Sequence, residues 1–121
     1  MDRQKIFEYV LEKYNTMPEY LWMKYQSYAV LRHDNNGKWY GIVMNVPRCK
    51  LGLDGNDMVD ILDVKCEPLM VDMLCRRPGF FPGYHMNKAN WVSIHLDGTV
   101  SDEEVFSLLD ESFACTAKRK K

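Results

Sequence analysis

The chain has 121 residues, 46% of them hydrophobic, and a formal net charge of −1, a composition typical of one globular domain. No apolar run approaches the roughly 18 residues of a membrane span. The N-terminal stretch MDRQKIFEYV is amphipathic and lacks the apolar core of a signal peptide. We therefore expect a cytoplasmic protein, and the overall charge gives no indication of nucleic-acid binding.

The four cysteines are far apart in the sequence and include no CxxC pair: Cys49, Cys66, Cys75 and Cys115. A zinc site needs clustered thiolates or imidazoles, and this spacing supplies neither. Nothing in the sequence indicates secretion, so disulfides are not expected. We predict reduced cysteines that fill space, with no metal site and no cofactor.

Residues 2–15 are predicted to form a helix, because their large apolar residues recur at helical spacing and make one stripe: Ile6, Phe7, Val10, Leu11 and Tyr14. Pro18 ends this helix. Residues 17–26 read as a linker that packs against the domain, since its large side chains are costly to leave in water: Tyr20, Leu21, Trp22 and Tyr25.

Residues 28–33 and 38–45 read as two strands joined by DNNG, in which Asn36-Gly37 suit a hairpin turn. Residues 46–57 form a loop or a short third strand, and 58–65 a further strand. Pro68 opens a short helix that ends in Arg76-Arg77.

Residues 90–96 alternate as a strand, with Val92, Ile94 and Leu96 on one face. Ser101 and Glu104 then form a capping box for an amphipathic C-terminal helix that contains Val105, Leu108, Leu109 and Phe113.

The predicted order is α-β-β-(β)-β-α-β-α. Strands joined by hairpins favour an α+β fold with an antiparallel sheet over βαβ units. The simplest packing places the helices mainly on one face of a two-layer structure and leaves the other sheet face partly open. One domain is expected over residues 1–117, followed by a basic tail, KRKK, at 118–121.

Catalysis finds little support in the sequence. His33, His85 and His95 lie near no recognisable nucleophile motif, and a pairing of Cys75 with His85 is the one conceivable arrangement. The stretch LGLDGND lacks the Gly-Lys-Ser/Thr of a phosphate-binding P-loop. We therefore expect a protein that is not an enzyme.

The segment from Arg76 to Leu96 contains basic and aromatic residues and no acid. Nucleic-acid binding needs cations for phosphates and exposed rings for unpaired bases. The segment offers Arg76, Arg77 and Lys88 for phosphates, Tyr84, His85 and Trp91 for stacking, and Asn87 for hydrogen bonds; the hairpin adds Lys38 and Trp39. The same residues are also compatible with a structural element in which Tyr84 and Trp91 close the edge of the core and Asn87 caps a turn.

Nearly the whole chain resembles the MmcQ/YjbR family of small bacterial proteins. The resemblance rests on Lys65-Cys66 and Pro68, on the loop PGYHMNKANW at 82–91, on Leu96-Asp97-Gly98 and on Asp102-Glu103-Glu104, with Lys38 and Tyr40 matching in the hairpin. It implies a two-layer α+β fold with an antiparallel sheet, described as CyaY-like or double-wing. It also implies a DNA-binding protein without established enzymatic activity or agreed catalytic residues.

Three functions stay open. The first is a monomer that binds DNA or another nucleic acid through the residues named above, without contact to a membrane. The second is a protein-interaction module that uses the open sheet face at Trp91, Ser93 and His95. The third is a small-ligand binder or enzyme around His85, which requires a concave pocket at that residue.

Overall fold

A computed structural model describes residues 1–117; the predicted basic tail at 118–121 lies outside the described residues. The elements are α1 (Arg3–Tyr14), β1 (Ala29–Arg32), β2 (Trp39–Pro47), a 3-10 helix η1 (Arg48–Leu51), β3 (Met58–Lys65), α2 (Pro68–Leu74), β4 (Phe80–Pro82), β5 (Trp91–His95) and α3 (Asp102–Thr116). The predicted helices and the four predicted strands are confirmed. The helix η1 takes the place of the optional third strand, and the short strand β4 was not predicted.

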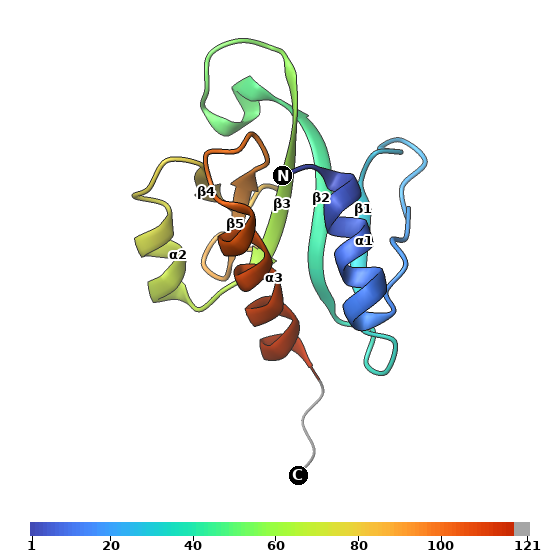
Figure 1. Cartoon of the computed structure of the whole chain (residues 1–121). Coiled ribbons are helices and arrows are strands. Elements are labelled where there is room, and N and C mark those ends of the chain that lie inside the picture. Colours follow the sequence, from blue (N-terminus) through green and yellow to red (C-terminus); the bar gives the residue numbers. More distant parts are fainter. Residues whose placement is uncertain (118–121) are drawn as a thin grey trace.

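The five strands form one antiparallel sheet in the order β1-β2-β3-β5-β4, so the predicted α+β class is confirmed. The helices α1 and α3 lie side by side across one face of the sheet, and α2 lies beside β4 and β5 (Figure 1). In the part of the chain that the structure describes, no helix combines the length and the apolar character that crossing a membrane requires.

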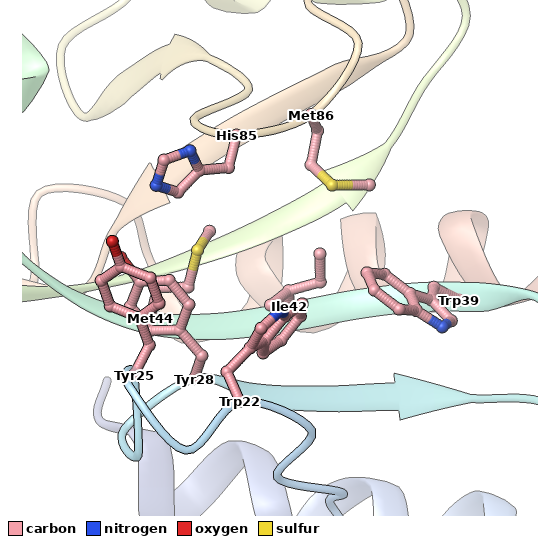
Figure 2. Close-up of a pocket in the computed structure, with 8 residues that line it drawn as sticks. All are labelled: Trp22, Tyr25, Tyr28, Trp39, Ile42, Met44, His85 and Met86. Carbon is pink, nitrogen blue, oxygen red and sulfur yellow. The ribbon is translucent and has the colours of Figure 1, made fainter.

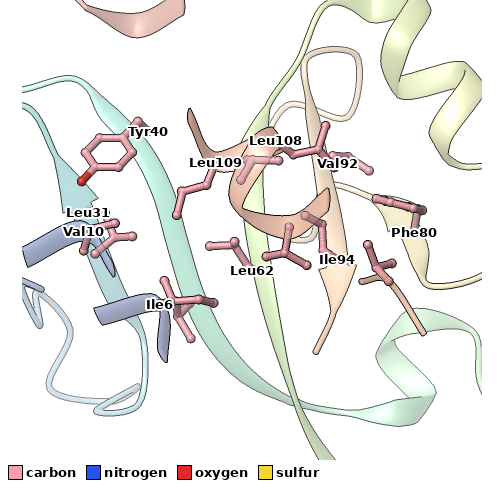
Figure 3. Packing of buried hydrophobic residues seen from close by; sticks show 14 of the residues in the cluster. Ile6, Val10, Leu31, Tyr40, Leu62, Phe80, Val92, Ile94, Leu108 and Leu109 are labelled. Atoms are coloured by element: carbon pink, nitrogen blue, oxygen red, sulfur yellow. The ribbon is translucent and has the colours of Figure 1, made fainter. Parts of the chain in front are cut away.

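The helix-side core lies between the sheet and the three helices. It includes Ile6 and Val10 from α1, Leu74 from α2 and Leu109 from α3. These side chains meet strand residues of the same face, such as Leu62, Val92 and Ile94 (Figure 3). Burial of aliphatic side chains of this size stabilises a fold by about 1.5–3 kcal/mol each, so this layer holds the sheet and the helices together.

The first turn of each helix is stabilised by a residue at or next to its start. The Asp2 side chain accepts a hydrogen bond from the Lys5 amide at the start of α1. Pro68 occupies the first turn of α2, where no amide hydrogen is needed. The Ser101 hydroxyl accepts from the Glu104 amide at the start of α3, which is one half of the predicted capping box; the Glu104 carboxylate accepts from Arg77 instead.

A β-bulge in β2 changes which side chains face the helices. Leu31 pairs with Gly41, whereas Arg32 pairs with Trp39, so Tyr40 is the extra residue. Tyr40 joins the helix-side core, and Trp39 packs with Ile42 on the opposite face. Strict alternation would have put Tyr40 and Ile42 on one face, so the bulge is what brings Trp39 to the side away from the helices.

The sheet face away from the helices is covered, which corrects the expectation of a partly open face. Two loops, 15–28 and 83–90, place side chains over a second buried cluster, the loop-side core, made of Tyr28, Val30, Ile42, Met44, Val46 and Ile61. Trp91, Ser93 and His95 are consequently only 7%, 0% and 7% exposed. Alternation in a sequence shows which residues share a face, and it does not show which loop covers them.

Candidate functional site

An aromatic pocket of about 270 Å³ lies between the two loops that cover the sheet. It is lined by Trp22, Tyr25, Tyr28, Trp39, Ile42, Met44, His85 and Met86. Figure 2 shows His85 and Met86 on one side, Trp22, Tyr25 and Tyr28 on the other, and the β2 side chains between them. Pockets for drug-sized ligands measure about 300–1,000 Å³, so this pocket suits a single ring system.

The rings of the pocket pack against one another in edge-on, stacked and tilted pairs. Trp22 stands edge-on to Trp39, with centroids 5.7 Å apart and planes at 89°. Tyr25 stacks on Tyr28 at 4.7 Å and 11°. The His85 ring lies 6.1 Å from Tyr28 and tilts by 50°. Tilted and edge-to-face pairs are the favoured arrangements of aromatic side chains, so the walls are stable without a ligand.

The 83–90 loop is held against β5 by a close backbone approach. The Gly83 amide donates to the Trp91 carbonyl over 2.9 Å. A Cβ atom at position 83 would lie 2.6 Å from the Trp91 Cβ, so only glycine fits. The Met86 amide then donates to the Gly83 carbonyl over 3.3 Å, which closes a turn across Tyr84 and His85.

His85 has φ 64°, in the left-handed region, which only a few per cent of non-glycine residues adopt, with Asn, Asp and His the most common among them. Gly83 itself is not one of the described residues with positive φ. The turn runs from Gly83 to Met86, and His85 takes the strained position. The His85 ring lines the pocket, and sparsely populated backbone conformations cluster at functional sites.

A buried carboxyl group lies beneath the same loop. Asp63 on β3 is 0% exposed, and its Oδ1 accepts a hydrogen bond from the Ser93 hydroxyl. The Ser93 oxygen in turn accepts from the Tyr84 amide over 2.9 Å. Oδ2 has no hydrogen-bond partner among the described residues. Burial raises the pKa of Asp63 to about 8, against smaller lowering effects of Ser93 and Lys88.

A second hollow lies beside the aromatic pocket, and a groove lies beside that hollow. The lysine hollow is lined by Lys50, Leu51, Phe81, Pro82, Tyr84 and Lys88. The arginine groove, of about 550 Å³, is lined by Arg48, Arg76, Arg77, Phe81, Pro82, His95 and Asp97 among others. Phe81 and Pro82 line both of them, and Tyr84 of the lysine hollow has its ring 4.0 Å from that of His85. The three hollows therefore follow one another.

Six of the nine residues that the sequence suggested for nucleic-acid contact line these hollows: Trp39, Arg76, Arg77, Tyr84, His85 and Lys88. The arginines are already paired with acids. Arg77 donates two hydrogen bonds to Glu104, over 2.6 and 2.7 Å, and Arg76 lies 3.2 Å from Asp72 in an exposed pair. A phosphate at Arg77 would have to compete with Glu104, which holds the guanidinium in place.

The other three suggested residues lie elsewhere. Lys38 is exposed at the hairpin, and Asn87 accepts a hydrogen bond from the Ala89 amide, which is the turn-capping arrangement. Trp91 is buried at 7% exposure, so the suggested stacking role does not fit its place in the core. The same burial removes Trp91, Ser93 and His95 as an exposed docking face.

Groups for acid, base or nucleophilic chemistry are dispersed in the described residues. His33 is buried and contacts the Thr116 hydroxyl, and His95 lies 3.3 Å from Asp97. Cys75 lines the arginine groove and His85 the aromatic pocket, so the conceivable Cys–His pair lies in two different hollows. The four cysteines are free thiols, and residues 1–117 contain no cluster of three or more metal-binding side chains.

Several residues of these hollows were not singled out by the sequence. Trp22 and Tyr25 read only as packing residues of a linker, and Lys50 lay in a loop without a pattern. Asp63 lies in a strand between two buried aliphatic residues, Leu62 and Val64. A carboxyl group between two such residues is the sequence signal that could have indicated a buried polar group.

The fold and its hollows define a small α+β domain with an aromatic surface pocket. The chain belongs to the YjbR family, whose family model matches residues 11–115, and the resemblance found in the sequence is confirmed. YyaQ, an uncharacterized protein of Bacillus subtilis (strain 168), is 48% identical over 96% of this chain and 98% of its own length. YjbR of Escherichia coli (strain K12) is 30% identical over 43% of this chain and 45% of its own.

Solved structures show the same fold. A crystal structure of a Pseudomonas syringae protein matches with a TM-score of 0.94 and 41% identity, over 97% of this chain and 100% of that one. A Deinococcus radiodurans protein with a DUF419 domain matches with a TM-score of 0.72 and 22% identity, over 96% of this chain and 79% of that one. The second match concerns the fold alone.

Proposed function

We propose that this protein is a non-catalytic module that binds single-stranded or locally unpaired nucleic acid across the three hollows. The continuity of the aromatic pocket, the lysine hollow and the arginine groove is the observation that carries the proposal. Binders of single strands combine stacking side chains with a groove of positive charge that follows the backbone. We further propose that it acts in the cytoplasm as a monomer.

One unpaired base enters the aromatic pocket in this account. Trp39 and His85 come from different parts of the chain, and both line a pocket whose size suits one ring. Stacking of a base on an aromatic side chain contributes about 1–3 kcal/mol. Every base has an aromatic face, so this contact favours unpaired bases with little preference among sequences.

In the proposed complex, the backbone phosphates of the strand contact the basic residues of the lysine hollow and the arginine groove. Lys50 and Lys88 are both exposed and line the lysine hollow together, and the Lys88 ammonium already donates to the Gly83 carbonyl over 3.0 Å. Arg76 is the more available arginine, since its pair with Asp72 is exposed on both sides and such pairs are weak.

Single strands suit this surface better than a duplex. In a duplex the base faces are stacked and cannot enter a pocket. The net charge of −1 also differs from the basic character of most duplex binders. Acids at Asp72, Asp97 and Glu104 lie along the arginine groove or pair with its arginines, and these would oppose the dense charge of duplex phosphates.

The test is fluorescence anisotropy with a labelled single-stranded oligonucleotide of about 12 nucleotides, measured across a salt series. Trp39→Ala should weaken binding by about 1–3 kcal/mol without changing the salt dependence. The double variant Lys50→Gln/Lys88→Gln should reduce the slope of log K against log salt by about 1.4, or about 0.7 for each phosphate contact.

Lys5→Gln is the matched control, since Lys5 is an exposed lysine of α1 on the helix side. It should leave both affinity and slope unchanged. Binding of the wild-type protein no tighter than about 10⁻⁴ M at low salt would rule out the proposal.

A second candidate is the binding of a free small aromatic ligand. The observation in its favour is the concave pocket at His85 that this function requires. A free nucleoside and the oligonucleotide distinguish the two functions. If the nucleoside binds as tightly as the strand and salt has no effect, the pocket serves a small ligand. If the strand binds more tightly and the gain is lost at high salt, the basic hollows take part.

A further inference from the structure

The chain of hydrogen bonds from Asp63 through Ser93 to Tyr84 connects a buried carboxyl group to the wall of the aromatic pocket. Asp63 lies on β3, Ser93 on β5, and the Tyr84 amide precedes His85 and Met86, which line the pocket. The Ser93 hydroxyl has one hydrogen and gives it to Asp63, so its oxygen is free to accept from the loop. Ser93 therefore links Asp63 to the loop by hydrogen bonds.

We propose that Asp63 is the positioning residue of the 83–90 loop, and that it keeps the aromatic pocket in its binding form only while its carboxyl group carries a proton. The proposal rests on the proposed function for its effect on binding. Its effect on the loop is independent of any ligand.

The surroundings of Asp63 explain why its charge matters. Its cross-strand neighbours are Ile42 on β2 and Ser93 on β5, and one carboxyl oxygen has no partner among the described residues. A neutral carboxyl group tolerates this environment, whereas a buried carboxylate with one hydrogen bond is strongly disfavoured. Ionisation must therefore bring in water or a cation, and either requires the loop to move.

The titratable or charged groups around Asp63 come from three directions: Tyr84 and Lys88 from the 83–90 loop, Tyr28 next to the start of β1, and Lys65 and His95 at neighbouring positions of the same sheet face. Lys88 is the cation named among the influences on Asp63, and it favours the carboxylate. Its ammonium now donates to the Gly83 carbonyl at the base of the loop. Attraction toward an ionised Asp63 would break that hydrogen bond.

Burial of Asp63 determines the direction in which pH changes the loop position and the affinity. Burial raises the pKa of Asp63 to about 8, so the proton is retained at neutral pH and lost as the pH rises through about 8. The loop should keep the described position below that range and leave it above. If only the protonated form binds, affinity falls by up to about tenfold for each pH unit above the midpoint.

The test follows the amide resonances of Tyr84 and Met86 by NMR in the free, full-length protein as the pH is raised. The wild-type protein should show one transition with a midpoint near 8. Asp63→Asn, which imitates the neutral carboxyl group, should abolish it. Ser93→Ala should move it to higher pH, because the Ser93 hydrogen bond lowers the pKa of Asp63. Asp57→Asn, at an exposed aspartate, should leave it unchanged.

A transition that persists in Asp63→Asn would overturn the proposal. Oligonucleotide affinity over the same pH range gives a second readout: it should fall above the midpoint in the wild-type protein and stay level in Asp63→Asn. If the loop titrates as expected and no oligonucleotide binds, the proposed function fails and the role of Asp63 in the loop stands. If the oligonucleotide binds equally well at every pH and the loop does not titrate, the role of Asp63 fails alone.

Discussion

The two faces of the sheet are built in different ways. On the helix side, side chains from three helices fill a continuous apolar core. On the loop side, two loops cover the sheet and leave an aromatic pocket, a left-handed His85 and a buried carboxyl group without a full set of hydrogen bonds. Strain and unsatisfied polar groups persist where function maintains them. The helix side is therefore a continuous apolar core, and the loop side is the face at which we propose binding.

The largest loss of stability should follow substitution of Trp91, for which the sequence allowed either a stacking role or a place in the core. Trp91→Ala should cost about 3–5 kcal/mol of unfolding free energy, because Trp91 is buried. Trp39→Ala should cost less, since Trp39 is only partly buried. Denaturant unfolding of both variants measures the difference. Equal losses would contradict the separation of the core tryptophan from the pocket tryptophan.

Asp63 should make stability depend on pH. Its folded pKa is raised to about 8 from 3.8, so the folded state binds more protons than the unfolded state between these values. Its contribution to stability is fully present below about pH 4 and is lost as the pH rises toward 8. As the pH rises through this range, the unfolding free energy of Asp63→Asn minus that of the wild-type protein should increase by at most about 1.4 kcal/mol for each pH unit.

Chemical denaturation at a series of pH values checks this slope. The comparison is made as a difference from wild type, because the other acids titrate equally in both proteins. A constant difference across the range would mean that Asp63 is ionised in the folded state.

The loop-side backbone offers a smaller test. Gly83→Ala should cost about 1–3 kcal/mol, because the new methyl group would lie 2.6 Å from the Trp91 Cβ and 2.9 Å from the Trp91 carbonyl oxygen. The loop should also move away from β5 and weaken oligonucleotide binding. A variant with unchanged stability would show that the 83–90 loop is not held tightly at this point.

The smallest effect is expected at the exposed arginine. Arg76→Gln should leave the melting temperature unchanged, since the pair with Asp72 is exposed on both sides and such pairs contribute little. Oligonucleotide affinity should fall modestly at low salt and not at high salt. A clear loss of stability in thermal melts would assign Arg76 a structural role.

The sequence predicted the helix side well and the loop side poorly, for a physical reason. Helical stripes such as Ile6 and Val10 and the cap at Ser101 are local signals, so α1, α3 and the antiparallel sheet were expected. The placement of Trp39 depends on the bulge at Tyr40, and the pocket depends on two loops distant in sequence. The spacing of residues along the chain shows neither the bulge nor the contact between the two loops, so the sequence could not show the pocket and assigned Trp91 an exposed role.

The central claim is tested most directly by the three tryptophan indole N–H resonances. Addition of a single-stranded oligonucleotide at low salt should shift the indole signals of Trp22 and Trp39, which line the pocket. The signal of Trp91, buried beside the loop, should stay in place, and Tyr84 and Lys88 amides should shift with the pocket. Shifts confined to residues of α1 and α3, or no shift at any indole, would contradict the account.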